Sequence, residues 1–549
     1  MDVLTGLVPG DAGSPSPRIV VLAGPGGPPT DVLTALPPRA DVVAIDVLHP
    51  DRLHVRLAAL APVDLVVDAG GEGAPDRLAH LLGHVRPGGA YACVLPDPAD
   101  PDDPADPADP AVTEWVERLT ALRVALTSGE QEVPPRKAKK RRALATLALA
   151  ARVRLEGRVL VAVNEVAMLA KLHDTEMDDV LRERGGPDQT VVSLPAASWH
   201  SRATVRVSRR PPLNDLPTTY AAPALSLREY HQAVCLPRQA AYAGTFVLPE
   251  SFRDNLQPRL QNPALEDWTA RFVRRPEDPP GSLAGSWFHL DTHLAGHFGH
   301  AVTEQVAHLW GWHEAKRRDP SLRALVFAPP ETPGAPLPAW NADLLEAGGV
   351  PREDVHVATG PVRVERLLAA TSAYNIGRYA HPVMAETWGR IGAHLDPSGS
   401  GGSGPDRVFL TRGGDKRVCR NRAEVEALVA GSGFVVVSPE RLPLAEQVRL
   451  VRGASVVAGF AGSAMFHTAF AAGPQHVVVI TTETYPAHNE HAIAALLGHR
   501  LDLVVCPPDV PRRDPDRFTL ESFHSDYVVG LDGPDGDFLR AALAPYSAT

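Results

Sequence analysis

Five residues in the C-terminal part of the chain could together bind a phosphate group. They are Arg412, Arg417 and Arg420 on one loop, and Gly462 and Ser463 in a glycine-rich turn. A guanidinium group can hold two phosphate oxygens at once. A turn that leads from a strand into a helix adds backbone N–H groups and the positive end of the helix dipole. These residues predict a diphosphate site; the alternative is that the arginines are solvated loop charges and the glycine only shapes a turn.

A second group of residues could move a proton. His297, His300 and Glu304 are spaced i, i+3 and i+7, which predicts that they share one face of a helix. Three interpretations are open. The histidines could be structural, they could hold a metal ion together with further ligands, or Glu304 or His300 could act as a general base toward a hydroxyl group.

The elements that position these residues follow from the hydrophobic pattern. Apolar runs of strand length alternate with segments of helical period between residues 407 and 507. The runs lie at residues 408–410, 434–437, 455–458, 476–480 and 501–505, and the helical segments at residues 422–430 and 444–452. Apolar strands separated by helices predict a parallel sheet covered on both faces. Such a sheet binds its ligand beyond the carboxyl ends of its strands, which is where Arg412 and Gly462 stand.

The order of motifs in this region resembles glycosyltransferase family 61, the DUF563 group. The matching residues are Thr411, Arg412, Arg417, Arg420, Asn421, Glu424, Gly433, Phe434, Pro439, Glu440, Glu446, Gln447, Gly459, Gly462, Ser463 and Phe470. His300 and Glu304 match a His-x-x-x-Asp/Glu pair that members carry on a helix facing the cleft. One position departs from the pattern, because many members have histidine where this chain has Ala461.

The resemblance implies an inverting transfer of a sugar from a nucleotide sugar, with a UDP-sugar as the expected donor, to a glycan, polysaccharide or glycoconjugate. Arg412, Arg417, Arg420, Gly462 and Ser463 would then hold the donor diphosphate. Glu446 would bind the ribose, Glu440 would shape the nucleotide or sugar pocket, and His300 and Glu304 would face the acceptor. No Asp-x-Asp motif stands at a strand end. We therefore expect no cofactor and no metal requirement.

A second glycine-rich turn lies near the N-terminus. Gly24, Gly26 and Gly27 follow an apolar run, and Asp46 ends the next run about 20 residues later, as in dinucleotide-binding folds. The run order, with D-L-V-V-D and R-P-G-G-A-Y, resembles a class I S-adenosylmethionine methyltransferase. The acidic residue that usually precedes the glycine turn is absent, and prolines stiffen the loop. The expected role is a degenerate structural domain; the alternative is S-adenosylmethionine binding at Gly24, Gly26, Gly27 and Asp46.

The expected fold class is α/β, with a GT-B-like pair of Rossmann-like halves preceded by an additional Rossmann-like domain. The predicted parts are residues 1–210 (methyltransferase-like, with an exposed Pro/Asp loop at 97–110), 211–396 (acceptor half), 397–405 (Gly/Ser hinge linker) and 406–549 (nucleotide-sugar half with a C-terminal tail). Two other functions stay open. One is a methyltransferase with a glycan-binding C-terminal half, and the other is an inactive sugar-binding scaffold, which Ala461 would favour.

Composition narrows the class of protein further. The net charge of -11 argues against general nucleic-acid binding, which needs a basic face. Only four cysteines occur, without Cys-x-x-Cys spacing, so a disulfide scaffold or zinc-thiolate site is not expected. No signal peptide and no apolar run of roughly 20 residues are found. We therefore expect a soluble, cytoplasmic and, from its Ala, Arg, Pro and Gly usage, bacterial protein. The basic run 136–142 predicts a solvated helix entry or a weak contact with an anionic membrane surface or acidic polymer.

Overall fold

The computed structural model of the protein describes most of the chain. The described residues are 2–8, 16–47, 50–70, 74–95, 110–135, 138–209, 216–329, 331–332, 334–398, 404–414, 416–514 and 518–544. The chain forms two compact units, each assembled from three segments. The first unit contains Met1–Thr190, Arg228–Ala284 and Pro361–Leu367, and the second contains Val191–Leu227, Gly285–Gly360 and Leu368–Thr549.

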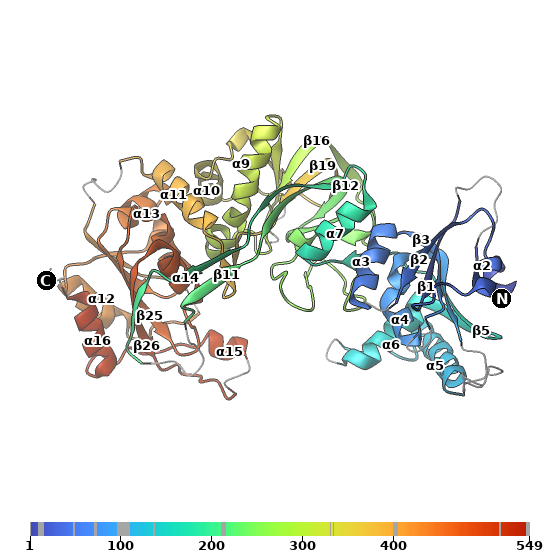
Figure 1. The fold of residues 1–549 in the computed structure, drawn as a ribbon. Helices are drawn as coiled ribbons and strands as arrows, with labels where there is room; N and C mark the ends of the chain where they lie inside the picture. Colours follow the sequence, from blue (N-terminus) through green and yellow to red (C-terminus); the bar gives the residue numbers. More distant parts are fainter. Residues whose placement is uncertain are drawn as a thin grey trace. The chain divides into compact units, whose positions relative to one another are not determined.

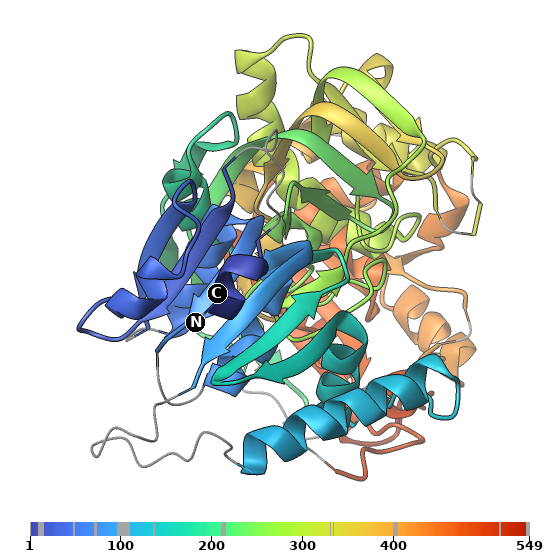
Figure 2. The same ribbon diagram turned by 90° about the vertical axis from the view of Figure 1, so that its right-hand side faces the viewer.

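The first unit contains a six-stranded sheet in the order β2-β1-β3-β4-β6-β5 (Figures 1 and 2). Its strands are β1 (Arg18–Ala23), β2 (Asp41–Asp46), β3 (Val63–Asp68), β4 (Val85–Val94), β5 (Ala151–Glu156) and β6 (Val159–Asn164). The first four are parallel, and β6 and β5 continue the sheet antiparallel. Its helices are α2 (Thr30–Thr34), α3 (Pro50–Leu60), α4 (Ala74–Leu81), α5 (Pro110–Thr127) and α6 (Lys139–Ala150). Helix α6 ends at Ala150, because Ala151 and Arg152 already pair in β5.

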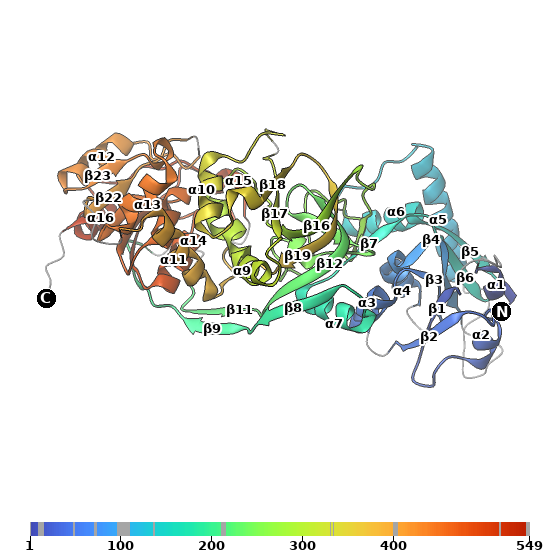
Figure 3. The same cartoon turned by 90° about the horizontal axis from the view of Figure 1, so that it is seen from above.

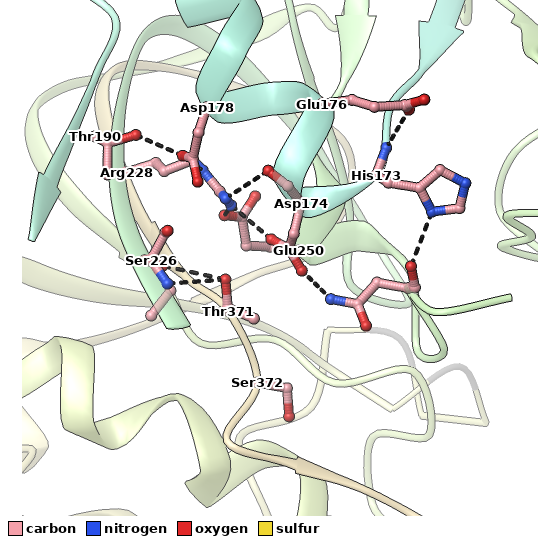
Figure 4. Close-up of polar contacts among 12 residues, drawn as sticks. His173, Asp174, Glu176, Asp178, Thr190, Ser226, Arg228, Glu250, Thr371 and Ser372 are labelled. Atoms are coloured by element: carbon pink, nitrogen blue, oxygen red, sulfur yellow. Dashed lines mark hydrogen bonds and ion pairs between the residues drawn. The ribbon is translucent and has the colours of Figure 1, made fainter. Parts of the chain in front are cut away.

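The rest of the first unit surrounds a buried charge cluster. Strands β7 (Met168–Lys171), β13 (Ala240–Ala243), β14 (Phe246–Val247) and β15 (Phe272–Arg274) pair there, and α7 (Asp174–Arg184) follows β7. The fully buried guanidinium of Arg228 contacts Asp174 at 2.7 Å, Asp178 at 2.8 Å and Glu250 at 2.7 Å (Figure 4). A buried charge must be paired and hydrogen-bonded to be tolerated, so this cluster fixes how α7 packs.

The second unit contains a six-stranded parallel sheet in the order β10-β26-β25-β24-β22-β23 (Figure 3). Its strands are β10 (Thr204–Val207), β22 (Arg407–Leu410), β23 (Val435–Val437), β24 (Val456–Phe460), β25 (His476–Thr482) and β26 (Arg500–Cys506). Core residues of α12 (Arg422–Gly431) and α16 (Pro534–Leu543) cover one face, and those of α13 (Leu444–Arg452) and α14 (His488–Leu497) the other. The α/β class and the five predicted strands of this sheet are confirmed. The edge strand β10 was not predicted.

A second layer of the same unit carries the segment that contains His300. Strands β16 (Gly281–His289), β17 (Arg323–Phe327) and β18 (Val355–Ala358) are parallel neighbours, and α9 (Leu309–Arg318), α10 (Ala339–Ala347) and α11 (Val383–Leu395) pack with them around Trp312 and Trp388. The remaining strands of the chain are β8 (Gln189–Leu194), β9 (Ala197–His200), β11 (Thr219–Ala222), β12 (Leu225–Leu236), β19 (Val362–Ala370), β20 (Tyr374–Asn375) and β21 (Tyr379–Ala380). The helix expected near residue 299 is irregular: α8 (Phe298–His300) leads into a π turn at Ala301–Gln305 before α9.

Some predictions fall on residues outside the described ranges. These are residues 97–109 of the Pro/Asp tract, 136–137 of the basic run and 399–403 of the Gly/Ser linker. The four predicted domain ranges stay predictions. Among the helices of the described ranges, none combines the length and the apolar character that crossing a membrane requires.

Candidate functional site

Arg412 and Gly462 meet at the carboxyl edge of the second unit's parallel sheet. Arg412 follows β22 and Gly462 follows β24, and these neighbouring strands align Leu410 with Gly459. The Arg412 guanidinium donates from Nη1 to the carbonyl oxygen of Ala461 at 2.8 Å and from Nη2 to that of Lys416 at 2.8 Å. The backbone carbonyl of Ala461, at the position where the family pattern has histidine, therefore anchors this arginine.

Gly462 lets two guanidinium groups approach the same α-carbon. Its φ of +133° is a conformation that residues with a side chain rarely adopt. A Cβ atom added there would lie 2.9 Å from Nη1 of Arg412 and 3.5 Å from Nη2 of Arg417. The glycine is thus required both by the backbone conformation and by the space that the two cations occupy.

The two guanidinium groups lie close together in a partly buried position. Burial lowers the pKa of Arg412, and the charge of Arg417 lowers it further. The Arg417 guanidinium lies 4.3 Å from the ring centroid of Tyr485 and 5.2 Å from that of Phe523. Within the described ranges neither guanidinium forms an ion pair with a carboxylate. Two adjacent, partly desolvated guanidinium groups favour a ligand with at least two negative charges.

Glu490 is a member of this site that the sequence did not reveal. It lies in the first turn of α14, is almost fully buried, and its Oε1 accepts a hydrogen bond of 2.8 Å from the amide of Gly462. Burial raises the pKa of Glu490 to about 7, although Arg417 acts in the opposite direction. A single glutamate in an ordinary helix sequence carries no signal of burial, because its environment comes from the neighbouring β24 turn.

His300 and Glu304 form a hydrogen-bonded pair. His300 Nδ1 lies 3.0 Å from Glu304 Oε2, and the two side chains are 16% and 8% exposed. With Nδ1 donating to the carboxylate, Nε2 of His300 is left as the proton acceptor. His297 was expected on the same helix face but lies just before the helix, with its ring 4.7 Å from that of His300. Burial lowers the pKa of His297, and His300 and Lys416 contribute in the same direction.

The histidine segment packs directly on the glycine-rich turn. A Cβ atom added to Gly299 would lie 2.9 Å from Cβ of Ser463 and 3.0 Å from the ring of Phe466. The ring of Phe298 stacks on that of His467 at 4.7 Å with an interplanar angle of 22°. The segment that bears the proton-accepting pair therefore contacts the same turn that the two arginines approach, within one unit.

Residues 298–479 match the Glycosyltransferase 61 family. This match spans the three arginines, the glycine-rich turn and the His300–Glu304 pair, confirms the resemblance inferred from the motifs, and indicates glycosyltransferase activity in general. A structure of MycE methyltransferase from the mycinamycin biosynthetic pathway, in complex with Mg and SAH, aligns at 16% identity with a TM-score of 0.19. The alignment covers 27% of this chain and 42% of that one. No curated protein matches the chain.

Three further residues of the predicted donor site lie at the periphery of the glycosyltransferase 61 segment. The Arg420 side chain is 58% exposed and pairs with Asp509 at 2.6 Å. Glu440 is exposed and accepts a hydrogen bond of 3.3 Å from the amide of Gly413. Glu446 lies exposed in the first turn of α13. The structure therefore brings together Arg412, Arg417, Gly462, Ser463, His300 and Glu304. Glu440 contacts the backbone next to Arg412, whereas within the described ranges no hydrogen bond or ion pair joins Arg420 or Glu446 to this group.

The N-terminal glycine turn lies in the other unit. β1 and β2 pair in parallel with Ala23 beside Asp46, which sets Asp46 next to the turn that starts at Gly24. A Cβ atom added at Gly24, Gly26 or Gly27 would meet nothing within 4 Å, so the turn is open. In the part of the chain that the structure describes, no group of three His, Cys, Asp or Glu side chains is arranged to hold a metal ion. The expected metal independence stays a prediction.

Proposed function

We propose that this protein transfers a sugar from a nucleotide-sugar donor, with a UDP-sugar as the expected substrate, to a glycan, polysaccharide or glycoconjugate in the cytoplasm. The donor diphosphate lies against Arg412 and Arg417, with the amide of Ser463 as a further donor. One observation carries the proposal: two guanidinium groups without carboxylate partners in the described ranges converge on Gly462, in a turn that touches the segment bearing His300 and Glu304.

The proposed reaction is a single displacement with inversion. The acceptor hydroxyl loses its proton to Nε2 of His300, whose ring Glu304 orients and whose positive charge Glu304 then stabilises. The acceptor oxygen forms a bond to the anomeric carbon while the bond from that carbon to the diphosphate oxygen breaks. Arg412 and Arg417 stabilise the negative charge that grows on the leaving nucleoside diphosphate. Proton uptake by His300 and stabilisation of the leaving group by the two arginines require the donor and the acceptor to meet next to Ser463.

Release of nucleoside diphosphate from a panel of UDP-sugars and other nucleotide sugars tests the proposal. We expect turnover by the wild type to fall at least tenfold in Arg412→Ala and to stay unchanged in Arg441→Ala, a matched change at an exposed arginine. Glu304→Gln should lower the rate of transfer roughly 10²-fold or more, in the range of general-base effects. A Glu304→Gln rate within about threefold of wild type would exclude the His300–Glu304 pair as the base.

Addition of EDTA checks the metal independence separately. We expect the rate to be unchanged, and a rate lost on chelation and restored by a divalent cation would contradict this part of the proposal. Differential scanning fluorimetry with nucleotides and nucleotide sugars gives an independent readout, because a ligand of the folded state raises the melting temperature. Binding without turnover of any donor would favour the inactive scaffold.

A second candidate function rests on the register of the first unit. Because β1 and β2 place Asp46 beside the open glycine turn, a ribose-bearing cofactor such as S-adenosylmethionine has an acidic partner there. Calorimetry with S-adenosylmethionine decides this question. Binding that Asp46→Ala abolishes, without any nucleotide-sugar turnover, would favour a methyltransferase with a glycan-binding C-terminal half.

A further inference from the structure

A cavity of about 780 Å³ lies on one face of the second unit's sheet, at its β10 edge. Its apolar floor consists of Val205 and Val207 from β10 and Leu503 and Val505 from β26. The cavity is completed by Thr481 and Thr482 at the end of β25, by Tyr485 and Pro486 in the loop that follows, by His491 of α14, and by the segments that precede β10 and β11. All of them lie outside residues 298–479, so the family match assigns this cavity no role.

The cavity is built for an uncharged group. None of its lining residues is Lys, Arg, Asp or Glu. Burial lowers the pKa of His491 to about 4, so its imidazole is neutral at pH 7. The polar lining residues include Thr481, Thr482 and His491. The Thr481 hydroxyl donates to the carbonyl oxygen of Tyr485, the Thr482 hydroxyl bonds that of Thr484, and Nδ1 of His491 bonds the Tyr220 hydroxyl. Lone pairs of the threonine oxygens and Nε2 of His491 are the polar atoms that these bonds do not use. A few polar groups on an apolar wall are what a site for a flat, neutral, heteroatom-bearing ligand requires.

Tyr485 connects this cavity to the paired arginines. Tyr485 lines the cavity, and the guanidinium of Arg417 lies 4.3 Å from the centroid of its ring. Two residues that border this ring have a positive φ without being glycine, Arg417 at +53° and Ala487 at +52°. In the described part of the second unit no other non-glycine residue does. Backbone strain of this kind persists where the surrounding structure enforces it.

We infer that this cavity binds the nucleoside of the donor, while the arginines bind its diphosphate. The inference rests on the proposed function and deepens it. A pyrophosphate at Arg412 and Arg417 has two substituents: the sugar must point toward His300 at the Ser463 side, and the nucleoside is then directed past Tyr485. The base would lie flat on Val205, Val207, Leu503 and Val505, with its edge and the ribose near Thr481, Thr482 and His491. The nucleoside site inferred here differs from the one that the motifs predicted, which was at Glu440 and Glu446.

A cavity-filling variant tests the inference by calorimetry. Ala203→Trp places a large side chain in the cavity, and Ala221→Trp, at an exposed position of β11, is the matched control. The ligands are UDP, GDP, CDP, ADP and inorganic pyrophosphate. We expect Ala203→Trp to weaken the tightest-binding nucleoside diphosphate at least tenfold and to change pyrophosphate binding less than twofold. Ala221→Trp should change neither.

Each outcome decides the matter. Nucleoside diphosphate that binds Ala203→Trp as tightly as the wild type places the nucleoside elsewhere; the inference is then wrong, while the proposed function stands. If Ala203→Trp binds nucleoside diphosphate with unchanged affinity but no longer transfers the sugar, the cavity binds the acceptor instead, and the inference is also wrong. If Ala203→Trp does not fold, Thr218→Trp at the exposed rim of the same cavity replaces it. If the wild type binds neither pyrophosphate nor any nucleoside diphosphate, the proposed function itself fails and the inference falls with it.

Discussion

Replacement of the buried carboxylate beside Gly462 should make the protein more stable at alkaline pH. Burial raises the pKa of Glu490 from its ordinary value of 4.5 to about 7. Between these values the folded protein retains a proton that the unfolded chain releases, so the contribution of Glu490 to stability falls as the pH rises through this window. A shift of this size corresponds to about 3 kcal/mol above pH 7. Glu490→Gln has the same shape, keeps an oxygen that can accept from the Gly462 amide, and lacks the ionisation.

Urea unfolding of wild type and Glu490→Gln at pH 5 and pH 8 measures this effect. We expect similar free energies of unfolding at pH 5 and a variant that is up to about 3 kcal/mol more stable at pH 8. Other titrating groups cancel when the two proteins are compared at each pH. Glu446→Gln, at an exposed glutamate of the same unit, should show no difference between the two pH values.

The opposite result would refute the reasoning about this carboxylate. If Glu490→Gln is less stable than wild type by a similar amount at both pH values, then Glu490 acts as an ionised partner of Arg417 rather than as a strained buried acid. The anion site predicts a second difference. Because the variant removes negative charge beside Arg417, pyrophosphate should bind Glu490→Gln at pH 8 at least as tightly as it binds the wild type. Weaker binding would mean that the anion does not lie at Gly462.

Three further predictions follow from the same kind of contact. Gly462→Ala should lower the free energy of unfolding by about 1–3 kcal/mol and weaken pyrophosphate binding, because the φ of +133° and the contact with Arg412 exclude a side chain at this position. Gly473→Ala is the control and should do neither, because a Cβ atom there would meet nothing within 4 Å. Arg228→Met should destabilise the first unit by roughly 3–5 kcal/mol in urea unfolding, since it leaves three carboxylates at a buried position without their cation. Burial lowers the pKa of His54 to about 4, so stability should fall as the pH drops from 6.5 to 4, and His54→Gln should reduce this loss in thermal melts.

The sequence predicted the parallel sheet of the second unit well because buried parallel strands are nearly continuous apolar runs. The helix expected over residues 444–452 has those bounds, and β25 and β26 begin within one residue of their predicted starts. Strand β10 was not predicted, for two reasons. Its sequence T-V-R-V alternates as an edge strand does, and its partner β26 lies almost 300 residues later, so only the folded chain reveals the pairing.

Sequence reasoning identified those residues of the candidate site that belong to local motifs. It missed those that only packing brings to the site. Arg412, Gly462 and the His300–Glu304 pair were identified by residue type and spacing. Glu490 and Tyr485 were not, because nothing in their own segments distinguishes a buried residue at the site from an ordinary one. The π turn at Ala301–Gln305 was also missed, since the spacing of His297, His300 and Glu304 had been interpreted as a regular helical period.

The two carboxylates near the site are suited to different tasks because their surroundings differ. Glu304 is hydrogen-bonded to His300, whose imidazole can take up a proton and whose resulting charge the carboxylate would then stabilise. Burial raises the pKa of Glu490 to about 7, so Glu490 is partly protonated near neutral pH, where the proposed function needs Arg412 and Arg417 to hold an anion. The Gly462 amide already donates to Glu490, so a diphosphate must use other donors of the turn. A fully ionised Glu490 would in addition compete with a diphosphate for the positive potential of Arg417. A partly neutral one fixes the turn in place and leaves most of the positive potential for the ligand.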